Sequence, residues 1–213
     1  KEMDEKLEEY ILQHIDKEDE ALQKINRAAH VQLLNPRMIS GHLQGKILKM
    51  LCQMIEPQVV LELGTFAGYS ALCLAEGLGD GGVVYTVEND DELEDFIREN
   101  LQSSPFGKRV KLHIGDALQF IESFEDGAID LSFVDADKRQ YLDYYKVLLP
   151  KMKKGGFIIA DNTLWSGKVL ETPHRTDLQT KGILAFNDFV ATDNRVEKVI
   201  LPLRDGLTII RVK

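Results

Sequence analysis

The sequence has few of the residues that build disulfide frameworks or multi-thiol metal sites. Its 213 residues include two cysteines, Cys52 and Cys73. Each lies in an apolar stretch of helical character, and their spacing matches no metal-binding pattern. We interpret both as reduced packing residues of a cytoplasmic protein.

Long apolar runs and an excess of basic residues are missing as well. No run approaches the roughly 20 apolar residues that span a membrane, and the charged segment KEMDEKLEEY lacks the apolar core of a secretory signal. The 35 aspartates and glutamates outnumber the 26 lysines and arginines, which gives a net charge of -9. Proteins that bind the phosphate backbone of nucleic acids are usually basic. We therefore expect a cytoplasmic protein whose partners include neither a membrane nor a nucleic acid.

The first quarter of the chain has the pattern of amphipathic helices. Apolar residues recur at helical spacing through residues 3–34, and Asn35-Pro36 ends this stretch. A further amphipathic helix is predicted over residues 43–55, with Pro57 after it. This part of the chain should therefore form a helical extension.

From residue 59 onward, short apolar runs alternate with helical segments. The runs are rich in β-branched residues and nearly continuous, as expected for strands buried on both faces. The segments between them are long enough to hold crossover helices, so the runs predict a doubly wound parallel sheet. The predicted strands are residues 59–63, 83–87, 110–114, 129–134 and 156–160.

The last two apolar runs, residues 196–202 and 207–212, are joined by a short segment that contains Asp205-Gly206. A connection this short cannot make a parallel crossover, and Asp-Gly favours a tight turn. We predict an antiparallel hairpin that completes a seven-stranded mixed sheet.

No repeat, low-complexity tract or linker interrupts these patterns. Together they predict one α/β domain over residues 1–213. Residues 1–56 would form its N-terminal helical cap, and residues 57–213 would form the α/β core.

A glycine-containing loop follows the first predicted strand, in the segment Glu62-Leu63-Gly64-Thr65-Phe66-Ala67-Gly68-Tyr69-Ser70. Glycines just after the carboxyl end of a parallel strand let the backbone turn tightly and approach a ligand. Glu88 ends the second strand, where a carboxylate can accept hydrogen bonds from two ribose hydroxyls. Taken alone, this pattern also fits an ordinary turn followed by a surface glutamate.

The glycine spacing distinguishes between two candidate ligands, NAD and S-adenosylmethionine (SAM). It lacks the third glycine of the G-x-G-x-x-G loop that holds a pyrophosphate in NAD-dependent enzymes. SAM has no phosphate, so a looser loop suffices, and the carboxylate of Glu62 suits a cationic ligand. Asp116, after the third strand, would lie where an adenine edge can be read, although Gly115-Asp116 also fits an ordinary helix N-cap.

Acidic residues follow the fourth and fifth predicted strands. Asp135 and Asp137 follow the fourth strand, and Asp161-Asn162 follows the fifth. Because neighbouring parallel strands end at one edge of a sheet, these oxygens would meet, and they suit Mg²⁺. Seen singly, each motif also fits a helix N-cap, whereas their combination favours a metal.

Lys138 lies three residues after Asp135, so a turn that starts there would aim both side chains at one ligand. An amine held beside a metal-bound hydroxyl can accept its proton, which makes Lys138 a candidate general base. The alternative is a solvated lysine in the first turn of a helix.

Four segments stand out together: VLELGTFAGYSALCLAEGL, YTVEND, FVDADKRQYLDYY and GGFIIADNTLWSGKV. They resemble the cation-dependent O-methyltransferase family, which includes catechol and caffeoyl-coenzyme A O-methyltransferases. The resemblance runs from about Met38 to the C-terminus and points to the small bacterial members. It implies the Rossmann-like fold of class I SAM-dependent methyltransferases, and a homodimer.

The resemblance also implies roles for individual residues. Lys138 would be the catalytic base, and Trp165 and Ser166 would border the acceptor. The metal ligands would be Asp135, Asp161 and Asn162, with Mg²⁺ as the expected ion and Mn²⁺ or Ca²⁺ as alternatives. The SAM-binding residues would be Met38, Ser40, Glu62, Gly64, Thr65, Ser70, Glu88, Asp116, Ala117, Asp135 and Asp137.

Two positions depart from branches of the family. Mammalian catechol enzymes have a glutamate where this chain has Thr208, and plant coenzyme A-type members have asparagine where it has Ser166. We therefore predict metal-dependent methyl transfer from SAM to a hydroxyl of a small catechol-like or other vicinal-diol acceptor. The alternatives are a sugar or antibiotic hydroxyl as acceptor, an NAD-dependent oxidoreductase, and a non-catalytic SAM-binding protein.

Overall fold

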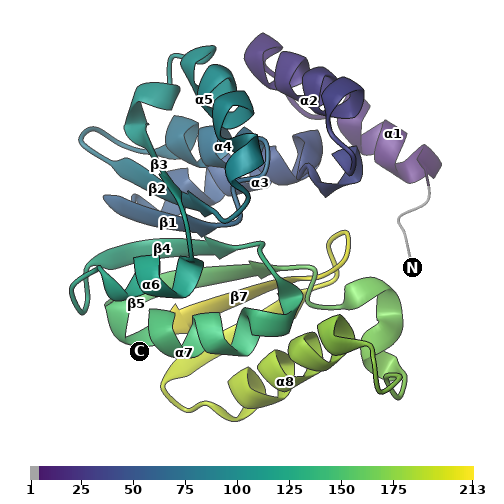
Figure 1. The fold of residues 1–213 in the computed structure, drawn as a ribbon, viewed down its shortest axis with the longest axis vertical. Coiled ribbons are helices and arrows are strands. Elements are labelled where there is room, and N and C mark those ends of the chain that lie inside the picture. Colours follow the sequence, from purple (N-terminus) through teal and green to yellow (C-terminus); the bar gives the residue numbers. More distant parts are fainter. Residues whose placement is uncertain (1–4) are drawn as a thin grey trace. The chain divides into compact units, whose positions relative to one another are not determined.

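The structure is a computed structural model that describes residues 5–213 (Figure 1). Predictions that fall on residues 1–4 lie outside this range. The strands form a seven-stranded sheet in the order β3-β2-β1-β4-β5-β7-β6. They are β1 (Val59–Leu63), β2 (Val83–Glu88), β3 (Val110–Ile114), β4 (Ile129–Val134), β5 (Met152–Asp161), β6 (Val196–Leu201) and β7 (Leu207–Val212).

The sheet is mixed, as predicted. β2 pairs with β3 in parallel, and β4 pairs with β5 in parallel. β7 runs antiparallel to both β5 and β6, so the predicted C-terminal hairpin is confirmed. β5 begins at Met152, earlier than the predicted residue 156.

Helices connect these strands and precede them. The α-helices are α1 (Glu5–Gln13), α2 (Glu20–Gln32), α3 (Gly41–Ile55), α4 (Tyr69–Gly77), α5 (Glu94–Gln102), α6 (Ala117–Glu122), α7 (Tyr141–Lys151) and α8 (Leu178–Thr192). The short 3-10 helices are η1 (Pro36–Met38), η2 (Asp91–Leu93), η3 (Gly107–Arg109), η4 (Lys138–Gln140) and η5 (Trp165–Leu170). Across residues 5–213, no helix is both long and apolar enough to cross a membrane.

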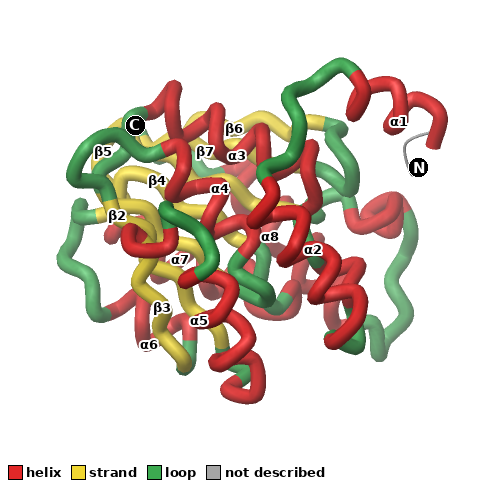
Figure 2. The backbone as a smooth tube through the Cα atoms, turned by 90° about the horizontal axis from the view of Figure 1, so that it is seen from above, coloured by secondary structure: helices red, strands yellow, loops and turns green. Residues whose placement is uncertain are grey.

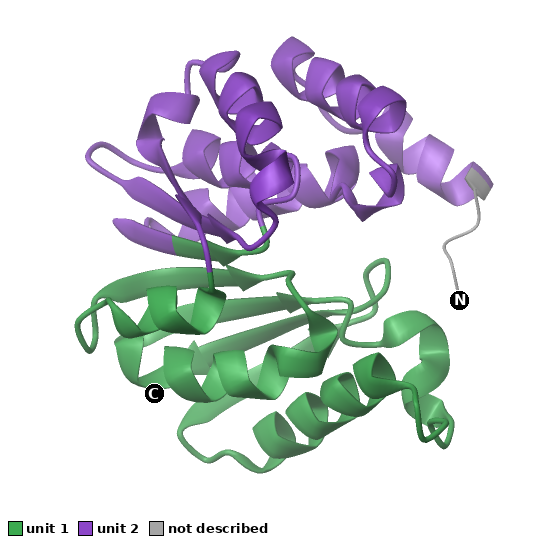
Figure 3. Cartoon of the chain, in the orientation of Figure 1, with its two compact units in different colours: residues 1–2, 61–64, 116–213 green, residues 3–60, 65–115 purple. Residues whose placement is uncertain are grey.

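The chain forms two compact units (Figure 3). Unit 1 comprises residues 61–64 and 116–213, and unit 2 comprises residues 5–60 and 65–115 of the described chain. The single domain over residues 1–213 stays a prediction.

In unit 2, the N-terminal helical stretch is broken into two helices. Figure 2 shows α1 and α2 joined by a loop, and the Asp19 side chain caps α2 by accepting a hydrogen bond from the Ala21 amide (2.8 Å). Such a cap satisfies an amide that the helix leaves without a partner, which explains why α2 begins there. Both cysteines are free and buried, Cys52 in α3 and Cys73 in α4, which confirms their packing role.

In unit 1, aromatic rings join α7 to α8. Tyr141 and Tyr145 of α7 meet the Phe186 ring of α8 edge to face, with centroid distances of 5.6 Å and 5.9 Å. All three side chains are buried. Because edge-to-face pairs are favourable beyond the area they bury, these contacts fix the N-terminal half of α7 against α8.

Candidate active site

The loop after β1 is held by Glu88 of β2, within unit 2. The Glu88 carboxylate accepts hydrogen bonds from the amides of Phe66 (2.8 Å), Asn89 (2.9 Å) and Asp90 (3.1 Å). It is buried, so the alternative of an ordinary surface glutamate is wrong. A carboxylate has about four acceptor sites. Glu88 therefore organises the loop and keeps acceptor capacity for a ligand hydroxyl.

Two further contacts in unit 2 fix the same loop. Thr65 Oγ1 lies 2.6 Å from Thr86 Oγ1, and both side chains are buried. The Asn100 amide donates to the Ala67 carbonyl oxygen (3.0 Å). Asn100 was not among the predicted residues. Its place among the apolar residues of one face of α5 is a sequence signal that could have identified it.

The other predicted residues of unit 2 differ in exposure. Ser70 lies in the first turn of α4 and is buried, as is Ser40 before α3. Met38 ends η1 and is 59% exposed. Their roles in SAM binding stay predictions.

In unit 1, the ends of β1 and β4 touch. The Asp135 amide donates to the Leu63 carbonyl oxygen (2.9 Å). Gly64 has φ +94°, and a Cβ there would lie 2.2 Å from the Asp135 carbonyl oxygen, so only glycine fits. Glu62, the preceding acidic residue, is fully buried in β1.

Two of the predicted SAM ligands in unit 1 cap helices. Asp116 is exposed and accepts a hydrogen bond from the Gln119 amide (2.9 Å), so the N-cap interpretation is confirmed for it. Ala117 is the first residue of the capped helix α6. Asp137 caps η4 through the Arg139 amide (3.0 Å), and hydrogen bonds from the Arg139 guanidinium lower its pKa.

The ends of β4 and β5 carry the predicted catalytic residues. Lys138 is buried, so the alternative of a solvated lysine is wrong. Its Nζ donates to Asp135 Oδ1 and to the Tyr141 hydroxyl, each at 2.7 Å. The Tyr141 hydroxyl in turn lies 3.0 Å from the carbonyl oxygens of Val134 and Asp161, the last residues of β4 and β5. This network links the ends of β4 and β5, which lie side by side as predicted for neighbouring parallel strands.

Burial and two nearby carboxylates change the pKa of the Tyr141 phenol. Burial raises its pKa most, and the charges of Asp135 and Asp161 raise it further. Asp161 is buried, and its Oδ1 accepts a hydrogen bond from the Asn162 amide (2.8 Å). Asn162 has a left-handed backbone (φ +56°), a conformation that is frequent at functional sites.

The donor set at these strand ends has the chemistry of a hard cation site. Within residues 5–213, no cluster of three or more histidine, cysteine, aspartate or glutamate side chains could hold a metal ion. The predicted metal ligands include only two side chains of these types, Asp135 and Asp161. The third ligand is the side-chain amide of Asn162. Carboxylate and amide oxygens are ligands that Mg²⁺ prefers, so the residues present fit the predicted ion.

The loop after β5 is held by the turn between β6 and β7. Thr208 is buried, and its hydroxyl donates to Thr163 Oγ1 (2.7 Å). The Asp205 carboxylate accepts a hydrogen bond from the Ser166 amide, and the Asp205 carbonyl oxygen accepts one from the Leu164 amide (2.9 Å). These contacts fix a loop in which Trp165 and Ser166 both have left-handed backbones, with φ of 46° and 53°.

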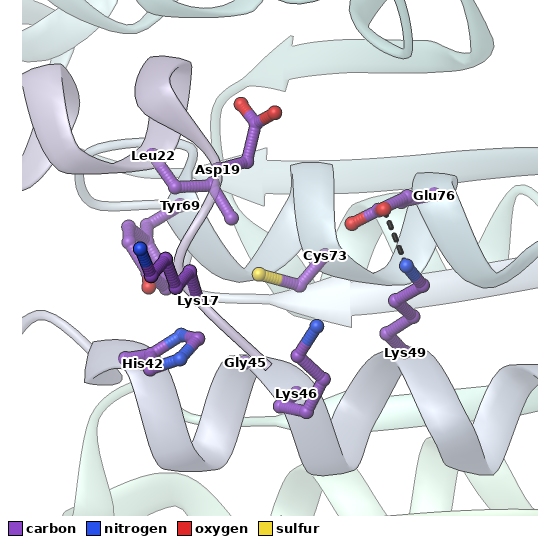
Figure 4. Close-up of a pocket in the computed structure, with 10 residues that line it drawn as sticks. All are labelled: Lys17, Asp19, Leu22, His42, Gly45, Lys46, Lys49, Tyr69, Cys73 and Glu76. Atoms are coloured by element: carbon purple, nitrogen blue, oxygen red, sulfur yellow. Dashed lines mark hydrogen bonds and ion pairs between the residues drawn. The ribbon is translucent and has the colours of Figure 1, made fainter. Parts of the chain in front are cut away.

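A polar pocket of about 180 Å³ lies elsewhere in unit 2, against α3 and α4 (Figure 4). Its walls carry Lys17, Lys46 and Lys49, together with the acidic residues Asp19 and Glu76. Figure 4 shows the ion pair between Lys49 and Glu76. None of the residues predicted to bind SAM, the metal or the acceptor lines this pocket, and its charges largely balance.

Known proteins decide the family. Residues 13–213 match the family model described as O-methyltransferase. The chain belongs to this family. A curated relative, caffeoyl-CoA O-methyltransferase 1 of Eucalyptus globulus, is 35% identical over 179 residues, which cover 79% of this chain and 72% of the relative.

Two solved O-methyltransferases share the fold. TomG from Streptomyces achromogenes, which is involved in tomaymycin synthesis and was solved in complex with SAM, is 27% identical with a TM-score of 0.90, covering 98% of this chain and 96% of that one. The O-methyltransferase from Bacillus cereus, solved with S-adenosylhomocysteine (SAH), is 30% identical with a TM-score of 0.87, covering 97% of each chain. The predicted class I methyltransferase fold is confirmed.

Proposed function

We propose that this O-methyltransferase transfers the methyl group of SAM to a hydroxyl of a small acceptor with adjacent hydroxyls, and that it requires a divalent cation. The observation that carries the proposal is the buried network in which Lys138, Asp135 and Tyr141 join the ends of β4 and β5. A protein that only bound SAM would need no buried amine beside a carboxylate. The SAM-bound and SAH-bound relatives support the choice of methyl donor.

We assign SAM binding to residues at the ends of β1, β2 and β3. In unit 2, the Glu88 carboxylate keeps acceptor capacity for a ribose hydroxyl beside its three backbone amides, and the loop that it holds contains Thr65. In unit 1, the fully buried carboxylate of Glu62 provides a negative charge that suits a sulfonium cation. We assign the adenine edge to Asp116 and its neighbour Ala117.

Asp135, Asp161 and Asn162 would hold the cation. When bound, a divalent cation would lower the pKa of an acceptor hydroxyl and fix the direction of its oxygen. Asp135 also holds the Lys138 amine at 2.7 Å, so the proposed base lies directly beside a proposed metal ligand.

Lys138 would take the hydroxyl proton while the acceptor oxygen bonds to the methyl carbon. The bond between that carbon and the sulfonium sulfur breaks, its electron pair stays on sulfur, and SAH leaves. Much of the acceleration would come from holding oxygen, carbon and sulfur in line, because positioning removes the entropy cost of a bimolecular encounter.

For the acceptor we propose a chemical class, small molecules with adjacent hydroxyls, and no single compound. One relative is named for caffeoyl-CoA, and TomG is involved in tomaymycin synthesis. The Thr208 hydroxyl already donates to Thr163, so we assign the acceptor contacts to Trp165 and Ser166 instead. We further propose a homodimer, which light scattering of the purified chain would test.

The test is methyl transfer from isotopically labelled SAM to a panel containing catechol, caffeoyl-CoA, a flavonoid and a polyhydroxylated antibiotic. We expect turnover of at least one acceptor with Mg²⁺ and none in excess chelator. Asp161→Ala should abolish turnover, whereas Asp126→Asn, a control at an exposed ion pair, should not change it. Undiminished turnover in chelator would refute the metal requirement, and no transfer to any acceptor would refute the acceptor class.

A further inference from the structure

We propose that Tyr141 is a positioning residue, which fixes the direction in which the Lys138 amine points. The inference rests on the proposed function, in which Lys138 is the base. Tyr141 occupies the first position of α7, three residues after Lys138, and its side chain is fully buried.

The amine has two of its directions occupied. Nζ lies 2.7 Å from Asp135 Oδ1 and 2.7 Å from the Tyr141 hydroxyl. Nζ has three tetrahedral directions besides its bond to Cε, so donation to these two oxygens leaves a single direction open. With Asp135 alone, the amine would rotate about one hydrogen bond. Tyr141 removes that freedom.

The phenol is itself held in place. Its oxygen lies 3.0 Å from the carbonyl oxygens of both Val134 and Asp161. It has one proton and two acceptor sites, so it donates to one of these carbonyls while it accepts from Lys138. Tyr141 thereby fixes the position of Nζ relative to the ends of β4 and β5, which also carry the proposed metal ligands.

Helix α8 supports both residues from the other side. A Cβ at Gly182 would lie 2.2 Å from the Lys138 carbonyl oxygen, so the helix packs directly on the backbone of Lys138. The Phe186 ring meets the Tyr141 ring edge to face at 5.6 Å. The Lys138 backbone and the Tyr141 ring therefore both pack against α8.

The role in the reaction follows from this geometry. The acceptor proton moves to the Nζ lone pair as the new carbon–oxygen bond forms, and the resulting ammonium then makes three hydrogen-bond donations. Tyr141 neither gains nor loses a proton in this step. It selects the orientation in which the proton can be received.

The first experiment needs no acceptor. In protein labelled with ¹⁵N at lysine side chains, the Lys138 amine signal is identified by its loss in Lys138→Ala. We expect Tyr141→Phe to shift or broaden this signal strongly. Tyr145→Phe is the matched control, because Tyr145 lies on the same buried helix face and its hydroxyl binds Asp193 (3.0 Å). An unchanged Lys138 signal in Tyr141→Phe would overturn the proposal, even if the methyltransferase activity proved different from the one proposed.

The second experiment is a double-mutant cycle on the single-turnover rate, with caffeoyl-CoA, SAM and Mg²⁺. General-base assistance is worth about 10² to 10⁴ in rate. We expect Tyr141→Phe to lose part of it, about 10-fold to 100-fold, with SAH affinity unchanged. In the Lys138→Ala background the same change should cost almost nothing, because the residue acts through Lys138. An equal loss in both backgrounds would show a merely structural role for Tyr141. If the wild-type chain does not methylate caffeoyl-CoA, the amine signal alone decides.

Discussion

At the scale of single residues, the Glu88 carboxylate serves the fold and a ligand at once. It satisfies three backbone amides, two of them just after β2 and one in the loop that follows β1. Buried hydrogen bonds to a charged group are stronger than those between neutral groups. The same side chain thus fixes the loop and presents a negative charge at its edge, which makes its removal informative.

Glu88→Ala should weaken SAH binding. Loss of hydrogen bonds to a buried carboxylate costs about 1.5 to 3 kcal/mol, which corresponds to roughly 10-fold to 150-fold in affinity. Isothermal titration calorimetry with SAH measures this directly. Glu92→Ala, an exposed neighbour on the same segment, should leave the affinity unchanged. Equal affinities for the wild type and Glu88→Ala would limit Glu88 to holding the loop.

Lys138→Ala should lower the single-turnover rate by about 10² to 10⁴ while SAH affinity stays the same. The loss should shrink at higher pH, because the acceptor hydroxyl then ionises without a base. Lys138→Arg should not restore the rate, because a guanidinium keeps its proton. Lys154→Ala, at an exposed position, is the control. Normal turnover by Lys138→Ala at neutral pH would leave Lys138 with an orienting role only.

At the scale of elements, the turn before β7 holds the loop after β5. Gly206 has φ +91°, and a Cβ there would lie 2.7 Å from the Leu164 amide nitrogen and 2.5 Å from Leu164 Cγ. The Thr163 amide donates to the Gly206 carbonyl oxygen (3.1 Å). The Asp-Gly pair that signals a hairpin in the sequence therefore also positions the loop that carries Trp165.

Gly206→Ala should disturb both the hairpin and that loop. A left-handed backbone at a residue other than glycine costs on the order of 1 to 3 kcal/mol, and the contact with backbone atoms of Leu164 adds to this. We expect a lower melting temperature and a raised KM for the acceptor. Gly79→Ala is the matched control, since its Cβ would meet nothing within 4 Å. If the two variants melted alike, the close approach at Gly206 would not limit stability.

A second element-scale contact gives a pH dependence. Asp193, after α8, accepts hydrogen bonds from Arg195 Nη2 (2.6 Å) and from the Tyr145 hydroxyl (3.0 Å). Hydrogen bonds from Arg195 lower its pKa well below the usual range. The folded pKa lies below the unfolded value of about 3.9, so this stabilisation is complete above that value and is lost as the pH falls toward the folded pKa.

Asp193→Asn should therefore destabilise the protein most at neutral pH, by about 1.5 to 3 kcal/mol for hydrogen bonds to a charged group. The difference in melting temperature from the wild type should narrow below about pH 4. Scanning calorimetry at a series of pH values measures it. Asp126→Asn, whose ion pair is exposed, should cost no more than about 1 kcal/mol. A difference that stayed constant down to acid pH would assign the effect to packing instead of charge.

The strands could be predicted because their β-branched runs are nearly continuous. The start of β5 was not predicted. Lys153 and Lys154 are exposed there and Gly155 has φ +80°, so this segment lacks the apolar pattern of a buried strand. It belongs to the strand because β5 pairs with β4. In the site, the spacing of Asp135 and Lys138 predicted that both side chains point to one place, and the structure shows them in direct contact. The partnership with Tyr141 could not be predicted, because a tyrosine in an amphipathic helix resembles packing until the strand ends opposite it are known.

At the scale of the whole molecule, the chain is an O-methyltransferase with an acidic net charge of -9. The two carboxylates proposed to bind SAM, those of Glu62 and Glu88, are both buried in the folded chain. A ligand that needs side chains held in place by the fold binds the native state and not the unfolded chain. Its binding should therefore appear as increased stability of the complete chain.

SAH at 100 times its dissociation constant should stabilise the native state by about 2.7 kcal/mol. For a chain of this size, each kcal/mol corresponds to roughly 2 to 4 °C in melting temperature, so we expect a rise of about 5 to 11 °C. NAD at the same concentration should produce none, because the loop lacks the third glycine of a pyrophosphate site. Thermal unfolding measured with each ligand, in Mg²⁺ and in chelator, separates the two. The SAH shift should survive in chelator, since Glu88 and Glu62 need no metal to bind the nucleoside and the sulfur end. A shift with NAD and none with SAH would refute the choice of SAM as methyl donor. A shift with SAH that required Mg²⁺ would instead place the cation in SAM binding.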